Sequence, residues 1–150
     1  MPLNESLEGT LAHELTHALV CHLPLPLRLN EGLAVSMENL LMHRSALPSM
    51  EDIAEHRARW TPEAIQGFWT GASFRAPEWQ RLSYQLAHGL LATLARDYDR
   101  LVQFANTAHW DDAGRSACRT VYGQDLGRLP QGMLGPGDWG PKPETWSGPK

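Results

Sequence analysis

Apolar residues recur at spacings of three and four along most of the chain, which is the period of an amphipathic helix. The first stripe predicts a helix over residues 7–23, which must end there because Pro24 and Pro26 cannot continue it. A second helix is predicted over residues 31–44, with Asn30 as its N-cap. The two prolines make the connection short, so the second helix can fold back against the first.

The helical spacing continues beyond this pair of helices. It predicts further helices over residues 49–59, 78–98, 99–108 and 111–122. Ser49 and Asp52 form a capping-box pattern at the start of the first of these. Residues 67–77 are rich in Gly, Ser, Pro and aromatics, and we expect a loop there. No run alternates with period two, so the predicted fold class is mainly α: a small helical bundle with little or no sheet.

The last part of the chain differs in composition. Residues 130–150 hold five prolines and five glycines, and this bias predicts a disordered tail. Two tryptophans, Trp139 and Trp146, lie in it without any periodic pattern around them. The sequence therefore predicts one helical domain over residues 1–129, followed by the tail.

Composition and charge narrow the class of protein. With 150 residues, 42% hydrophobic and 20% charged, the chain fits one globular domain. Its net charge of -4 offers no basic face for nucleic acid, and two cysteines exclude a disulfide scaffold. No apolar run approaches the ~18 residues of a membrane span. No signal peptide is visible at the start, so a cytoplasmic location is expected for the chain as written.

Residues 13–17 read His-Glu-Leu-Thr-His, the HExxH pattern. On a helix, residues four apart share a face, so His13 and His17 can bind one metal ion. Glu14 lies about 100° further round, beside the metal, where it can take a proton from a metal-bound water. Zinc lowers the pKa of such a water toward ~7. A catalytic zinc site also needs a third protein ligand and an open position.

Glu31 is the best candidate for the third ligand. It opens the second predicted helix within Leu-Asn-Glu-Gly-Leu-Ala, and thirteen residues separate it from His17. A hairpin of two helices with this connection can bring the three groups together. Glu38 lies seven residues later on nearly the same face, and is the predicted acceptor for the second ring N–H of a ligating histidine. The alternatives are ordinary structural roles: surface histidines on an amphipathic helix, and glutamates that a helix dipole or solvent stabilises.

These residues resemble those of a known family. The segments over residues 13–17 and 29–34 are similar to the HExxH helix and the glutamate helix of gluzincin metallopeptidases, in the peptidase MA-like clan. Ser-Tyr-Gln-Leu-Ala over residues 83–87, followed by residues 101–108 and 117–123, is similar in order to the later helices of small bacterial members. The resemblance covers residues 9–129. It is strong around the two segments with the candidate metal ligands, residues 13–17 and 29–34, and weak after Met42.

The resemblance implies a zinc-dependent peptidase acting on a peptide or protein substrate. His13, His17 and Glu31 would bind Zn²⁺, and Glu14 would be the general base. Tyr84 would donate its hydroxyl to the oxyanion of the tetrahedral intermediate, whereas a tyrosine that only packs on its helix is the alternative. His88, one turn later, is expected to be a structural histidine.

The chain departs from the family in ways that leave a second function open. Relatives have a β-sheet before the HExxH helix, for which this chain has no room. The gap between HExxH and the glutamate is short, and Ser36 stands where many relatives have an aromatic residue. The alternative is therefore a zinc-binding helical module without peptidase activity, or a fragment of a longer peptidase. The sequence does not predict an oligomeric state.

Overall fold

The computed structural model describes residues 10–11, 13–17, 30–34 and 48–146. Residues 13–17 and 30–34 are helical. The later helices, with η marking 3-10 turns, are α3 (Met50–Arg59), α4 (Ala64–Thr70), η1 (Ala72–Arg75), α5 (Pro77–Leu94), α6 (Tyr98–Thr107), η2 (Trp110–Asp112), α7 (Arg115–Tyr122), η3 (Leu126–Arg128), α8 (Gln131–Leu134) and η4 (Pro143–Thr145). The described ranges contain no strand, and the predicted fold class, a mainly α small helical bundle, is confirmed. None of their helices is long and apolar enough to cross a bilayer.

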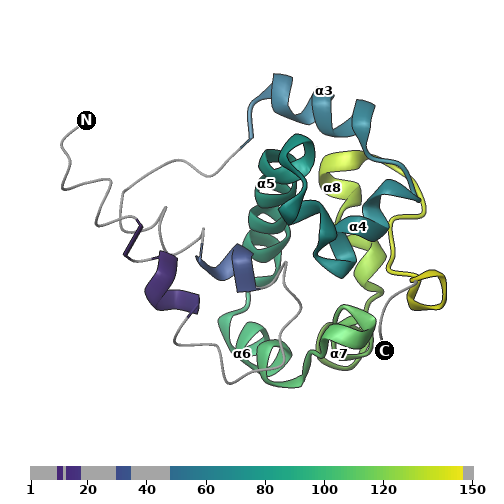
Figure 1. Cartoon of the computed structure of the whole chain (residues 1–150). Coiled ribbons are helices and arrows are strands. Elements are labelled where there is room, and N and C mark those ends of the chain that lie inside the picture. Colours follow the sequence, from purple (N-terminus) through teal and green to yellow (C-terminus); the bar gives the residue numbers. More distant parts are fainter. Residues whose placement is uncertain (1–9, 12, 18–29, 35–47, 147–150) are drawn as a thin grey trace.

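Helix α5 is the centre of the bundle and carries the apolar stripe expected from the sequence. It starts at Pro77, where a missing N–H costs nothing because the first N–H groups of a helix lack partners in any case. Its buried leucines are Leu82, Leu86, Leu90, Leu91 and Leu94. Figure 1 shows the helical pieces 13–17 and 30–34 on one side of α5, and α4 and α8 on the other. The N-terminal helical pieces and α8 near the C-terminus thus lie on opposite sides of the same central helix.

Most of the predicted helices are present with shifted ends. Helices α3 and α6 match the predictions over residues 49–59 and 99–108 within a residue or two. The prediction over residues 111–122 is divided into η2 and α7, because Ala113 and Gly114 both have left-handed backbone angles (φ 56° and 81°). A continuous helix cannot pass through two such residues.

The predicted loop over residues 67–77 is wrong. Helix α4 extends into this segment and ends at Gly71, whose φ of 90° suits a glycine C-cap. The turn η1 follows directly. Phe68 and Phe74 are buried, with stacked rings whose centroids are 5.6 Å apart. The Gly, Ser and Pro content suggested a loop, but burial of these aromatic rings holds the segment in helical turns.

The predicted disordered tail is also wrong for residues 130–146. This segment forms α8 and η4. Trp139 is 8% exposed and joins the hydrophobic core, and Pro130 and Pro141 are fully buried. The carbonyl of Trp139 accepts a hydrogen bond of 2.7 Å from Nε1 of Trp69 on α4. The expected boundary at residue 129 therefore falls within packed structure.

Gln66 of α4 forms hydrogen bonds with polar groups of the irregular C-terminal segment. Its Nε2 donates to the carbonyl of Gly140 at 3.0 Å. Its Oε1 accepts from the backbone N–H of Lys142 at 2.8 Å and from Nε1 of Trp146 at 2.9 Å. A segment without regular structure can be packed only if its polar groups find such partners. The Gln66 side chain thus supplies backbone hydrogen bonds that a helix or a sheet would otherwise provide.

A buried histidine links α3 to α5. Ser49 and Asp52 make the predicted capping box at the start of α3, and His56 lies one turn further on, fully buried. Nε1 of Trp60 donates to Nδ1 of His56 at 2.9 Å. Nε2 of His56 therefore carries the proton and donates to Oε1 of Gln85 at 2.9 Å. Burial is the main cause that lowers the pKa of His56, so the neutral ring is the folded form.

This arrangement predicts an acid-dependent loss of stability. The pKa of His56 is lower in the folded protein than its ordinary value of 6.5, so between these two values the unfolded chain binds more protons. Stability is therefore lost as the pH falls through about 6.5. We expect His56→Gln to lower the unfolding temperature at neutral pH and to flatten its fall on acidification. The measurement is thermal unfolding of the metal-free protein between about pH 7.5 and 5.5.

The matched control is His109→Gln, because His109 is exposed. This variant should keep the full acid-dependent loss. An unchanged slope in His56→Gln would contradict the assignment of the proton uptake to His56.

Candidate metal centre

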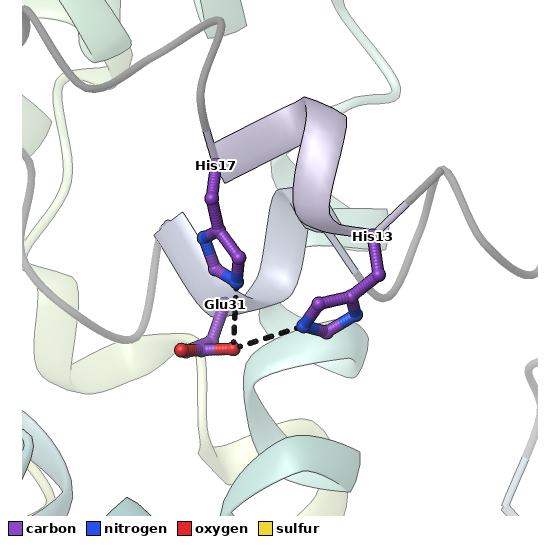
Figure 2. Close-up of side chains that lie close together, drawn as sticks. All are labelled: His13, His17 and Glu31. Atoms are coloured by element: carbon purple, nitrogen blue, oxygen red, sulfur yellow. Dashed lines mark ion pairs between the residues drawn. The ribbon is translucent and has the colours of Figure 1, made fainter. Parts of the chain in front are cut away.

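The three predicted ligands, His13, His17 and Glu31, lie close together. Figure 2 shows the rings of His13 and His17 pointing from one helical piece toward the Glu31 carboxylate on the other. The Nε2 atoms lie 3.4 Å (His13) and 3.3 Å (His17) from Oε2 of Glu31. One donor atom from each residue falls within a span of 4.8 Å. These three residues could hold a metal ion, and no other group of three ligating residues does so in the described ranges.

The helical spacing places both histidines on the inner face of their helix. Their rings meet edge to face with centroids 4.8 Å apart. Leu11 and Leu15 lie on the opposite side of the helix and are 54% and 53% exposed. The histidines, and not the leucines, therefore face the neighbouring helical piece.

A glycine sets the position of Glu31. A Cβ on Gly32 would lie 3.1 Å from the carbonyl oxygen of Ala87 on α5. This distance is shorter than ordinary van der Waals contact, so the backbone of residues 30–34 approaches α5 more closely than a larger residue would allow. Ala34, two residues further on, is completely buried. The close approach carries Glu31 to the surface of α5 that bears Tyr84.

Asn30 orients one of the histidines. Its Oδ1 lies 2.5 Å from Nδ1 of His17, so Nδ1 carries the proton and donates it to the amide oxygen. The other nitrogen, Nε2, is then left with a lone pair that faces Glu31. Metal-binding histidines are commonly held in this way. The sequence predicted Asn30 only as an N-cap, and Asn30 is itself helical.

The predicted partner for the ligating histidines, Glu38, lies outside the described residues, as do His22, His43 and Cys21. Asn30 makes the contact to His17 for which Glu38 was proposed. The signal in the sequence was the position of Asn30 directly before the ligand Glu31, which places both on the same turn. Its significance depends on how the two helical pieces face each other, which periodicity alone does not reveal.

The electrostatics of the group fit a cation. Oε2 of Glu31 is buried and has no hydrogen-bond partner among the described residues. It faces the lone pair on Nε2 of His17 at 3.3 Å. Two acceptors at this separation repel each other unless a positive charge lies between them or the ring gains a second proton. Two imidazoles and one carboxylate form a donor set suited to a divalent ion such as zinc.

Tyr84 of α5 lies beside the ligands. Its ring centroid is 6.5 Å from that of His13. Burial, followed by the negative charge of Glu31 and hydrogen bonding to it, raises the pKa of Tyr84 to about 12, and the charge of Glu14 acts in the same direction. The phenol therefore keeps its proton at neutral pH and remains a hydrogen-bond donor. The structure thus brings Tyr84 and Glu14 into the neighbourhood of the three ligands.

His88 and Cys118 occupy structural positions in the core. His88 is buried in α5, and burial lowers its pKa, as expected for a neutral core histidine. Cys118 is completely buried in α7. Glu14 is exposed on the helix of His13 and His17.

Comparisons of the chain with protein-family models, with curated proteins and with solved structures find no match. The chemistry of the centre therefore rests on its own residues and geometry. The candidate centre consists of two histidines and a glutamate that converge, an asparagine that orients one ring, and a protonated tyrosine beside them.

The close approach at Gly32 predicts a packing effect on the centre. We expect Gly32→Val to push residues 30–34 away from the Ala87 carbonyl, because its branched side chain adds atoms where a Cβ alone is already crowded. The expected loss of stability is about 1–3 kcal/mol, together with weaker metal binding. Thermal unfolding and metal titration measure the two effects. Gly132→Val is the matched control, since nothing lies within 4 Å of a Cβ there, and equal effects of both would contradict the packing argument.

The hydrogen bond between Asn30 and His17 predicts a specific effect on metal affinity. Asn30→Ala removes the acceptor for Nδ1, so the ring is free to turn or to change its tautomer. We expect metal affinity to fall by about 10- to 100-fold with little change in the helix content of the protein. Metal titration with circular dichroism as the fold control tests this. Unchanged affinity in Asn30→Ala would show that the hydrogen bond does not orient the ligand.

Proposed function

We propose that this chain is a zinc-dependent peptidase of the gluzincin type, with His13, His17 and Glu31 as the zinc ligands. One observation carries the proposal: two imidazole nitrogens converge on a buried carboxylate oxygen that has no hydrogen-bond partner among the described residues. Three protein ligands are the number that catalytic zinc sites use, leaving one position for the reaction. The proposed substrate class is a peptide or protein, because HExxH on a helix is the pattern of zinc metalloproteases.

Glu14 is the proposed general base. Zinc, when bound, supplies a Lewis acid that polarises the scissile carbonyl and lowers the pKa of water. Glu14 follows His13 directly in the same helical piece and is exposed, and its charge acts on Tyr84. It takes a proton from the attacking water and passes it to the leaving amine. The carboxylate ends the cycle in the form in which it began.

Tyr84 is the proposed oxyanion donor. Because its pKa is raised to about 12, the hydroxyl is protonated throughout the neutral range. It can donate a hydrogen bond to the oxygen that gains charge as the carbonyl is attacked. A donor of this kind contributes roughly 3 kcal/mol to the stability of the transition state.

The general-base assignment predicts a separation between metal binding and catalysis. We expect Glu14→Gln to keep zinc at one ion per chain and to lose peptide hydrolysis by at least about 100-fold, since the amide cannot take up the proton. His17→Ala should lose both zinc and activity. Metal analysis of the purified protein, together with cleavage of a peptide library, measures the two quantities.

Glu51→Gln is the matched control, because Glu51 is an exposed glutamate on α3, whereas the ligands lie on other helices. It should leave both zinc content and hydrolysis unchanged. Stoichiometric zinc without turnover of any peptide by the wild-type protein would contradict the peptidase and leave a zinc-binding module. Absence of zinc binding would contradict both functions.

A further inference from the structure

A second aromatic ring packs against Tyr84. The ring of Phe74 in η1 meets the ring of Tyr84 edge to face, with centroids 5.3 Å apart and an interplanar angle of 89°. Aromatic pairs favour this perpendicular contact, which fixes the orientation of both rings. Tyr84 is therefore in contact with Phe74 as well as with the ring of His13.

Phe74 is itself firmly held. Its side chain is 4% exposed and stacks on Phe68 of α4 at 5.6 Å. The residue before it, Ser73, is tied to α5, because its hydroxyl accepts a hydrogen bond of 2.6 Å from the buried hydroxyl of Ser83. Ser83 directly precedes Tyr84 in the chain. The turn η1 is thus fixed to α5 at the position from which Tyr84 projects.

We propose that Phe74 is a positioning residue that holds the phenol of Tyr84 against the metal centre. This inference rests on the proposed function for its catalytic consequence, but its structural part concerns only where the Tyr84 ring lies. Without the ring of Phe74, the Tyr84 ring has room to move away from the Glu31 carboxylate. Displacement of about 1 Å of a group that acts in a transition state costs up to about 100-fold in rate.

The activity test separates Phe74 from a residue that is merely part of the core. Phe74→Leu should lower kcat about 10- to 100-fold with KM and zinc content unchanged, because the Tyr84 hydroxyl acts in the transition state. In a Tyr84→Phe background, Phe74→Leu should cause little further loss of kcat, since the hydroxyl is already absent. Phe74→Met serves as a second variant if the first does not fold.

Phe104→Leu is the matched control. Phe104 of α6 is also completely buried and also meets a tyrosine edge to face, in this case Tyr122 at 5.9 Å. Neither ring of that pair is assigned to the metal centre. Its substitution should lower the unfolding temperature as much as Phe74→Leu does, and leave kcat unchanged.

A spectroscopic test does not depend on turnover. The protein is labelled with fluorotyrosine, and the signal of Tyr84 is identified by its loss in Tyr84→Phe. The shift of this signal between the zinc-loaded and the cobalt(II)-loaded protein reports where the ring lies relative to the metal. We expect a smaller cobalt-induced shift in Phe74→Leu and Phe74→Met, and the wild-type shift in Phe104→Leu.

The two tests can fail separately. An unchanged cobalt-induced shift in both Phe74 variants overturns the positioning role, whatever the activity. An equal fall of kcat in Phe104→Leu overturns it as well, because the effect would then be one of stability. A wild-type protein without turnover contradicts the proposed peptidase, and the cobalt-induced shift still decides the role of Phe74. If no metal binds, the line width of the Tyr84 signal in the metal-free protein decides it: broadening confined to the Phe74 variants supports the role, and equal widths overturn it.

Discussion

The backbone of residues 30–34 lies so close to α5 that a Cβ added at Gly32 would be only 3.1 Å from the Ala87 carbonyl oxygen. The metal centre depends on this contact, because it carries Glu31 to the face of α5 that bears Tyr84. The histidine helix completes the group through Glu31, where the donor atoms converge, and through the hydrogen bond between His17 and Asn30. The two short helical pieces are thereby placed by this tight backbone contact, by polar groups and by the packing of Leu33 against the core, while the leucines of the first piece remain exposed.

The sequence predicted the two candidate histidine ligands because their geometry is local. His13 and His17 share a helix face by spacing alone, and Glu31 follows from the need for a third ligand on a helix that folds back. The role of Asn30 could not be predicted in this way. It depends on the rotation of one helix relative to the other, which is set by packing between residues distant in the sequence. The same side chain that suits an N-cap is here turned toward a histidine ring.

The prediction of the fold is confirmed where hydrophobic spacing is regular. It is wrong where it was based on Gly and Pro content. The leucines of α5 are regular, and the helix is present. Pro and Gly content suggested disorder for residues 130–146, but Trp139 supplies apolar surface that offsets the entropy of ordering this segment. Its backbone also needs polar partners, and Gln66 of α4 provides two of them, as well as one for the Trp146 indole. No local pattern reveals such a partner some seventy residues away.

Three consecutive residues of α5 explain why the Tyr84 side chain projects from α5 in one fixed direction. Successive positions on a helix point about 100° apart, so Ser83, Tyr84 and Gln85 face three different neighbours. Ser83 is hydrogen-bonded to Ser73 in η1, and Gln85 to His56 in α3. Rotation of α5 about its axis would break both hydrogen bonds, and the loss of buried partners is costly. The two residues that flank Tyr84 therefore fix the helix face from which its phenol reaches Glu31, and Phe74 has only to fix the orientation of the ring.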